Sequence, residues 1–533
     1  MKKTLVLLLS FVLSLSLFSQ TKTKKANILW GEEYKIPKKI TLSGIIGYDN
    51  TGIYALKYSA SLFGGVKYYL DFIDNSMIRK NSEEINLEEE NGKEKEYEFL
   101  INFHNKLMLF SSFNNQKDKT NYLFYQTMDK KALKPNLDIK KIAEISSEKG
   151  SRYNAGSFSY EISGDSSKLL IYYELPYQSG EKEKFGFKVY DPSMNELWTK
   201  DITLPYEDKL FGIEDYEIDN KGNVYILGIL YKDKVKEKRH GQPNYSYLVL
   251  AYRNNGNDVT EYPIVIPGKF ITDMQLTINE TTGDIVCGGF YSDEGTFSIK
   301  GSYFLTVDKN SKNIKKESYN EFGIDFITQN MTEHKAKKVK KKADKGKNIE
   351  MYQYDLHELV KKDDGGAVLI GEQYYVKVVT TTYTDSQGHM RTTTTYYYFY
   401  NDIIVIDISP EGDILWTKKI PKKQITANDG GYFSSYALAV VNDKLYFIFN
   451  DNPKNLYETQ AGKTSNFNLR KEALTVLVEM NNEGEFTREA LFSDKNARVI
   501  VRPKVCQQIS DNVIILFAER GTKEKYAKVT IKN

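Results

Sequence analysis

The sequence is poor in the residues that support the commonest protein chemistries. It has only 2 Cys, Cys287 and Cys506, which excludes a disulfide framework and predicts buried free thiols. Only 5 His are present, and none are paired at the spacing of metal ligands, so we predict neither a metal site nor a bound cofactor. No Gly-x-Ser-x-Gly elbow, zinc helix, calcium loop or phosphate-binding loop occurs. The catalytic residues of the familiar enzyme classes are therefore missing.

The chain also lacks an excess of either charge. Lys and Arg number 74 and Asp and Glu number 71. This balance argues against nucleic acid as the partner, because neutralising phosphates normally requires a clear basic surplus. The mean hydropathy is −0.52, and no apolar run after residue 18 approaches the roughly 20 residues that span a bilayer. We expect no transmembrane segment in the mature chain.

The N-terminus has the pattern of an export signal. Met1-Lys2-Lys3 is positive, Leu5 to Phe18 is nearly all apolar, and Ser19 is small. This pattern predicts a signal peptide over residues 1–19 and an exported protein, periplasmic or extracellular after cleavage. The alternative is a membrane anchor, which a run this short disfavours.

A short apolar run recurs along the rest of the chain, which contains 40 Tyr and 27 Phe. Each copy follows a turn and is followed by a second apolar segment, which is typical of buried strands joined in hairpins. Eight copies occur, at 52–56, 106–110, 168–172, 223–227, 284–288, 367–371, 444–448 and 512–516. Regular repetition of strands at this spacing is typical of a β-propeller.

The three Trp residues suggest how such a ring would close. Leu197-Trp198 and Leu415-Trp416 each follow the second strand of a repeat, whereas Leu29-Trp30 opens the mature chain with no repeat before it. We therefore expect residues 28–37 to supply the outer strand that the last repeat lacks. The fold prediction is all-β, a single propeller over residues 20–533 with eight four-stranded blades, seven being the alternative.

Two segments resemble a known repeat family. Asp407, Gly412 and Trp416, and less completely Asp191, Asn195 and Trp198, resemble the docking motif of quinoprotein-like (PQQ-like) propeller repeats. The resemblance implies a propeller fold. It does not imply a cofactor.

Two other segments depart from the repeat. Residues 331–348 contain eight Lys, which predicts either a solvated loop or a basic segment that binds an anionic surface. Residues 372–400 alternate Thr, Tyr and Val around a Gly-containing turn, which predicts an extended β-hairpin. Such a hairpin cannot bury both faces by itself, so we expect it either to fold over the propeller or to contact a partner or a second copy.

The loops that enter each repeat would surround one mouth of the central channel. If a ligand binds there, its contacts are expected among the polar and aromatic residues of these loops. The candidates are Arg152, Tyr153, Lys269, Asn428, Asp429, Tyr432, Arg498 and Arg502. Ordinary turn chemistry is the alternative interpretation of the same residues.

The leading functional hypothesis is a non-enzymatic exported propeller that binds a protein or glycan of the cell envelope. The alternative is a glycan-active hydrolase or lyase with its site at the channel mouth, since aromatic faces stack on sugars. A quinone-dependent oxidoreductase is a third possibility, for which the sequence supplies no cofactor-binding residues.

Overall fold

The computed structural model describes residues 20–36, 40–61, 65–87, 89–90, 93–147, 154–176, 180–362, 364–457, 464–469 and 471–532. Strands make up 61% of the chain and helices 6%, which confirms the all-β prediction. The predicted signal peptide and the last residue of the expected 28–37 strand lie outside the described residues. So do Arg152 and Tyr153.

Within this part of the chain, eight antiparallel sheets have four or more strands, and they are numbered here in chain order. Sheet 1 is β4 (Ile40–Asp49), β5 (Gly52–Ser61), β6 (Gly65–Asp74) and β7 (Arg79–Glu84). Sheet 2 is β10 (Glu96–Phe103), β11 (Lys106–Asn115), β12 (Thr120–Asp129), β13 (Lys134–Pro135) and β14 (Lys140–Ser146). Sheet 3 is β15 (Ser157–Ile162), β16 (Leu169–Glu174), β17 (Lys182–Tyr190) and β18 (Glu196–Glu207). Sheet 4 is β19 (Phe211–Ile218), β20 (Val224–Tyr231), β23 (Tyr245–Arg253) and β24 (Asp258–Ile264).

The second half of the chain continues the series. Sheet 5 is β25 (Phe270–Ile278), β26 (Ile285–Ser292), β28 (Gly301–Val307) and β29 (Ile314–Glu321). Sheet 6 is β31 (Asp355–Lys361), β32 (Ala367–Thr384), β33 (Met390–Ile408), β34 (Ile414–Ile420) and β35 (Gln424–Ala427). Sheet 7 is β36 (Ala437–Val441), β37 (Lys444–Asp451), β38 (Leu474–Met480) and β39 (Phe486–Ser493).

Sheet 8 joins the two ends of the chain. Its C-terminal strands are β40 (Ile500–Val501), β41 (Gln507–Ser510), β42 (Val513–Arg520) and β43 (Lys523–Ile531). Its N-terminal strands are β1 (Gln20–Lys22), β2 (Ala26–Trp30) and β3 (Tyr34–Lys35). β2 pairs antiparallel with β43, with Ala26 opposite Ile531 and Trp30 opposite Ala527.

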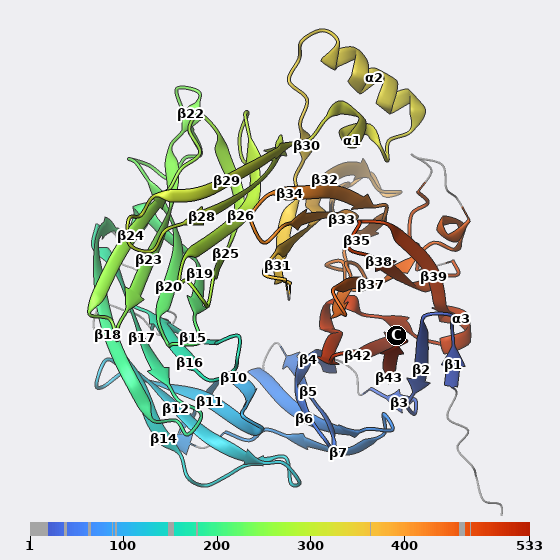
Figure 1. Ribbon diagram of the computed structural model, residues 1–533. Coiled ribbons are helices and arrows are strands. Elements are labelled where there is room, and N and C mark those ends of the chain that lie inside the picture. Colours follow the sequence, from blue (N-terminus) through green and yellow to red (C-terminus); the bar gives the residue numbers. More distant parts are fainter. Residues whose placement is uncertain are drawn as a thin grey trace, which may run out of the picture.

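The apolar runs are continuous because each central strand is covered on both faces. Along β37, Leu445, Phe447 and Phe449 pack with sheet 6, whereas Tyr446 and Ile448 pack with sheet 8. A similar apolar cluster lies between each sheet and the next, and another joins sheet 8 to sheet 1. The sheets follow one another around a common centre (Figure 1).

The Trp residues of the outer strands have two different packing directions. Trp198 donates from its indole nitrogen to the Gly222 carbonyl (3.0 Å), and Trp416 donates to the Asn482 carbonyl (2.8 Å), each in the next sheet. Trp30 instead packs edge-on against Phe492 of the preceding sheet, with ring centroids 4.8 Å apart. Trp30 therefore matches the others in strand position but not in its contact.

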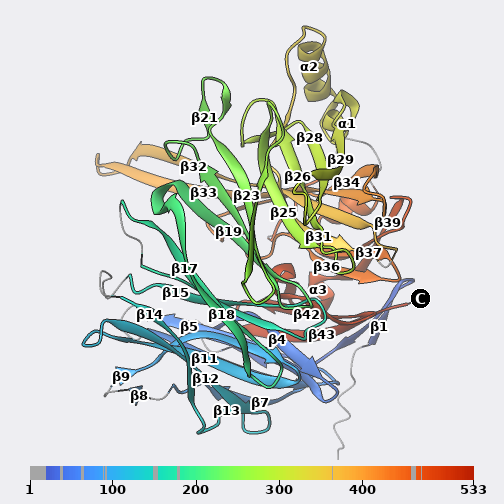
Figure 2. The same ribbon diagram turned by 60° about the vertical axis from the view of Figure 1, so that its left-hand side comes forward.

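The lysine-rich insertion contains a helix where a loop was expected, while its exposure to solvent agrees with the prediction. α1 (Ile324–Thr328) is followed by α2 (Glu333–Ala343), which stands out from the ring (Figures 1 and 2). Ala336, Val339 and Ala343, spaced three and four residues apart, form its half-buried side. A further short helix, α3 (Asp494–Ala497), precedes β40.

Small elements complete the described structure. They are the two-stranded pairs β8 (Glu89–Glu90) with β9 (Lys93–Glu94), β21 (Lys238–Arg239) with β22 (Gln242–Pro243), and β27 (Ser298–Ile299) with β30 (Met351–Tyr352). Three 3-10 turns lie at Asp208–Leu210, Pro453–Leu456 and Pro503–Val505. No helix among the described residues has the length and apolar character needed to cross a membrane.

Candidate functional site

The structure brings four of the sequence-predicted residues, Asn428, Asp429, Tyr432 and Arg502, into one cluster. The loop of residues 428–432 follows β35, and the Arg502 guanidinium lies 3.9 Å from the ring centroid of Tyr432. The Tyr432 hydroxyl is 2.7 Å from the Thr41 hydroxyl, and Lys504 Nζ donates to the Tyr400 hydroxyl over 3.2 Å. This group is called the rim cluster below.

Within the rim cluster, several polar groups are already used to build the loop. The Asn428 side chain accepts from the Tyr396 amide (2.9 Å), and Asp429 Oδ1 accepts from the Thr426 hydroxyl and the Gly431 amide. Arg502 is buried and donates to the Leu42 carbonyl (3.2 Å). These contacts are the turn chemistry that Asn and Asp commonly provide.

Lys269 and Arg498 lie apart from this cluster. Arg498 ends α3 with a left-handed backbone (φ 60°) and lies near Glu33. Lys269 lies between sheets 4 and 5, where its ammonium pairs with Asp293. The sequence analysis expected these residues to line one channel mouth together. The described ones instead lie in three places: the rim cluster, the end of α3 and the space between sheets 4 and 5.

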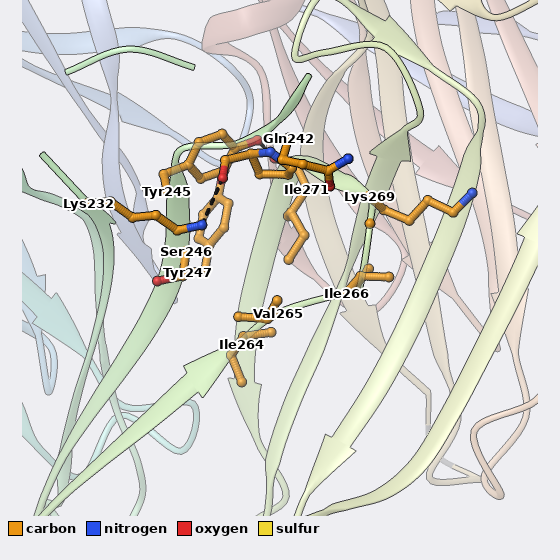
Figure 3. Close-up of a pocket in the computed structure, with 12 residues that line it drawn as sticks. Lys232, Gln242, Tyr245, Ser246, Tyr247, Ile264, Val265, Ile266, Lys269 and Ile271 are labelled. Atoms are coloured by element: carbon orange, nitrogen blue, oxygen red, sulfur yellow. Dashed lines mark hydrogen bonds between the residues drawn. The ribbon is translucent and has the colours of Figure 1, made fainter. Parts of the chain in front are cut away.

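A cavity of about 400 Å³ lies between sheets 4 and 5, and Lys269 is one of its lining residues (Figure 3). Its lining includes the apolar residues Ile264, Val265, Ile266 and Ile271 together with Tyr245 and Tyr247. Figure 3 shows the Lys269 side chain extending away from Ile264 and Val265, and Lys232 Nζ donates to the Pro243 carbonyl (3.0 Å). Because both amines have partners inside the protein, few polar groups converge on the interior of this cavity.

A buried ion pair that the sequence analysis missed connects the rim cluster to the sheet interior. Glu372 and Lys422 are both 0% exposed, and their charged groups are in contact. Glu372 also accepts from the Ser435 hydroxyl (2.7 Å), while Lys422 donates to the Tyr400 carbonyl and to Gln424, each over 3.0 Å. Burial lowers the pKa of Lys422, and the Glu372 carboxylate opposes that effect.

His357 extends this polar network towards the centre of the ring. Its Nε2 lies 3.9 Å from Glu372, and its Nδ1 is 3.1 Å from the Tyr436 hydroxyl. Burial lowers the pKa of His357, and Glu372 partly restores it. The imidazole is therefore favoured in its neutral form.

Carboxyl groups with raised pKa values lie on the first strands of several sheets. Burial raises the pKa of Asp273 and of Asp355 to about 6, and that of Glu98 and of Glu217 to about 7. Asp355 further raises the pKa of Asp273, whose Oδ2 accepts from the Leu356 amide (2.6 Å). No group of three or more His, Cys, Asp or Glu able to hold a metal occurs among the described residues.

A second cavity, of about 350 Å³, lies where the lysine-rich insertion meets the base of the extended β-hairpin. One wall comes from the segment between α1 and α2 together with the first turn of α2. The other comes from the base of the β32–β33 hairpin and from β35. Its lining residues are Asn330, Met331, Thr332, Lys335, Gln373, Tyr375, Phe399, Asn401, Asp402, Lys422, Lys423, Ile425 and Thr464. It is called the insertion cavity below.

Beyond this cavity, β32 and β33 run on as a two-stranded ribbon, residues 373–400. The ribbon projects from the ring (Figure 2) and turns at residues 385–389. Val378 is 54% exposed and Met390 78% exposed, and Val376, Tyr383, Tyr396 and Tyr397 are also exposed. β35 pairs with β33 only over Tyr397–Tyr400, so most of both ribbon edges is unpaired within the described structure.

Comparisons with known proteins give a likeness of fold at a low level. No protein-family model and no curated protein sequence matches the chain. The β-propeller domain of the Trilobed protease from Pyrococcus furiosus is similar with a TM-score of 0.34 and 11% identity, over 86% of this chain and 97% of that chain. A Pyrococcus horikoshii acylaminoacyl peptidase is similar with a TM-score of 0.34 and 8% identity, over 92% of this chain and 60% of that chain.

A protein of unknown function from Bacteroides caccae is also similar, with a TM-score of 0.27 and 9% identity, over 70% of this chain and 98% of that chain. All three TM-scores are below 0.5. The resemblance to quinoprotein-like repeats stays a prediction from two segments.

Proposed function

We propose that this chain is exported after loss of residues 1–19 and folds as one eight-bladed β-propeller closed by β2. Two observations support the architecture. Eight apolar clusters join the eight sheets in succession, including sheet 8 to sheet 1, and β2 pairs with β43. A closed ring leaves few exposed sheet edges, which keeps a protein rich in strands soluble.

We further propose that the protein acts by binding a protein or glycan of the cell envelope. One observation carries this proposal: the two segments that depart from the repeat line the same cavity. An insertion is not needed to build a blade, so its conformation is free to serve recognition. The ribbon beside the cavity adds an exposed apolar surface with unpaired edges, which soluble proteins normally cover.

The test is affinity purification of the tagged protein from chemically cross-linked cells, compared with a ribbon variant. Val378 and Tyr396 lie opposite each other on the ribbon, and V378T/Y396T removes exposed apolar surface while keeping β propensity. V259T, on β24 and 50% exposed, is the matched control. A stoichiometric partner that is lost only from V378T/Y396T supports a ribbon interface. Equal recovery with all three proteins removes the ribbon from the proposal.

The alternative, a glycan-active hydrolase or lyase, has one observation in its favour. Asp273 and Asp355 are neighbouring carboxyl groups whose pKa values rise to about 6, as an acid catalyst requires. Reducing-end assays on a panel of polysaccharides, with D355N as the comparison, test it. Activity that is absent from D355N supports catalysis at this pair, whereas no product from any polysaccharide leaves binding as the function.

A further inference from the structure

The insertion cavity combines an aromatic surface with planar polar groups. Tyr375 and Phe399 are stacked with ring centroids 4.3 Å apart and planes 12° apart, and both line the cavity. The amides of Gln373 and Asn401 lie beside them, and Asn401 Oδ1 is buried without a hydrogen-bond partner among the described residues. Aromatic faces pack on the C–H faces of sugar rings, and amides exchange hydrogen bonds with hydroxyl groups.

A stripe of lysines leads away from this cavity along α2. Lys335 lines the cavity, and Lys338 and Lys342 follow at intervals that place them on the same side of the helix. From Lys335 to Lys342 the rise is roughly 10 Å, about the length of two linked sugars. All three are exposed, and none has an acidic partner among the described residues.

Two of the other three lysines of α2 differ from the stripe. Lys337 pairs with Glu333 (2.6 Å) and Lys340 with Asp325 (2.5 Å), so their charges are offset within the protein. Four lysines of α2 have no acidic partner among the described residues; three of them form the stripe, and Lys341 is the fourth.

We propose that the insertion cavity and the lysine stripe together bind a polyanionic glycan, a chain of sugars that carry carboxylate or sulfate groups. One sugar packs against the outer side of the stacked Tyr375–Phe399 pair, and the acidic groups of the following sugars contact Lys335, Lys338 and Lys342. This inference rests on the proposed function, in the case where the ligand is a glycan, and it names the class of glycan that binds. A protein partner fits the stripe less well, because protein interfaces are enriched in Arg and aromatic residues and depleted in Lys.

The experiment measures binding of labelled polygalacturonate, neutral dextran and oligothymidine to the full-length mature protein by fluorescence anisotropy. K335Q/K338Q/K342Q removes the stripe. K337Q/K340Q/K341Q on the same helix is the control with the same change in net charge, and Gln keeps the helix propensity. We expect the stripe variant to bind polygalacturonate about tenfold more weakly, and the control variant to change less than about threefold. Binding should weaken as salt is raised.

Y375S tests the aromatic part of the site. We expect weaker polygalacturonate binding with an unchanged salt dependence, because the lysines remain.

The other outcomes distinguish failure of the polyanionic-glycan site from failure of the proposed binding function. Equal losses in both lysine variants, or tighter binding of oligothymidine than of polygalacturonate, would overturn a dedicated polyanionic-glycan site. Equal binding of dextran would overturn the charge requirement but support glycan binding. No glycan binding, together with a protein partner lost from V378T/Y396T, would overturn this inference and leave the proposed function intact. Absence of both would overturn both.

Discussion

A single substitution that breaks the Glu372–Lys422 pair is expected to lower the free energy of unfolding more than most other single substitutions in the chain. In K422M the Glu372 carboxylate stays fully buried, with the Ser435 hydroxyl as its remaining donor and His357 3.9 Å away. Removing one partner of a buried ion pair costs about 3–5 kcal/mol, because the other charge is left without compensation. E372Q, which leaves the Lys422 ammonium unpaired, is expected to cost a similar amount.

The double variant E372Q/K422M is the informative comparison. It removes both charges and leaves an amide oxygen at position 372 that can accept from the Ser435 hydroxyl, so it should be no less stable than either single variant. Urea unfolding followed by tryptophan fluorescence measures all four proteins, since Trp30, Trp198 and Trp416 lie in three different sheets. If the double variant costs the sum of the two single costs, the residues do not interact and the reasoning is refuted.

The same substitution has a second, independent readout. The Lys422 charge lowers the pKa of His357, so K422M should raise the pKa of the His357 imidazole. An NMR titration of the imidazole resonances measures this pKa. An unchanged value would show that Lys422 is not charged in the native protein.

Three further predictions concern pH, ring closure and the ribbon. Burial raises the folded-state pKa of Asp355 to about 6, so the contribution of this carboxyl group to stability is present below about pH 4 and lost as pH rises through 6. In scanning calorimetry, the melting temperature of D355N should therefore fall less between pH 4 and pH 7.5 than that of the unmodified protein. An equal fall in both proteins would contradict the raised pKa. W30A should lower the free energy of unfolding, measured in urea, by about 3–5 kcal/mol, because the Trp30 side chain of β2 is buried against Phe492 of sheet 7. A loss below about 1 kcal/mol would mean that β2 does not secure the ring. V378T/Y396T should change stability by less than about 0.5 kcal/mol, since both side chains are exposed, and a larger loss would place the ribbon in the folded core.

The repeated strands could be predicted because their pattern has a simple physical cause. A strand covered on both faces needs apolar residues at every position, and 445–449 shows this with side chains alternating between two clusters. The packing direction of Trp30 could not be predicted in the same way, because strand pattern fixes the position of a side chain but not which neighbouring sheet it meets.

The helix in the lysine-rich insertion was predictable but was missed. Ala336, Val339 and Ala343 carry a helical spacing, which the number of lysines concealed.

The polar residues of the site were predicted least well. Asn428 and Asp429 are turn-forming residues, and the structure uses their side chains in the loop. Glu372 and Lys422 are 50 residues apart in the sequence and resemble the many surface charges. The signal was the position of Glu372, directly after the apolar run 367–371, where a charge requires a partner.

The most direct test of the central claim is photo-cross-linking in the organism's own cells, with a photoreactive amino acid placed at Thr332 of the insertion cavity. The same amino acid at Val265, in the cavity of Figure 3, is the comparison. The account predicts a light-dependent adduct, to protein or to glycan, from position 332 and none from position 265. An adduct from position 265 alone would place recognition between sheets 4 and 5 and contradict the account.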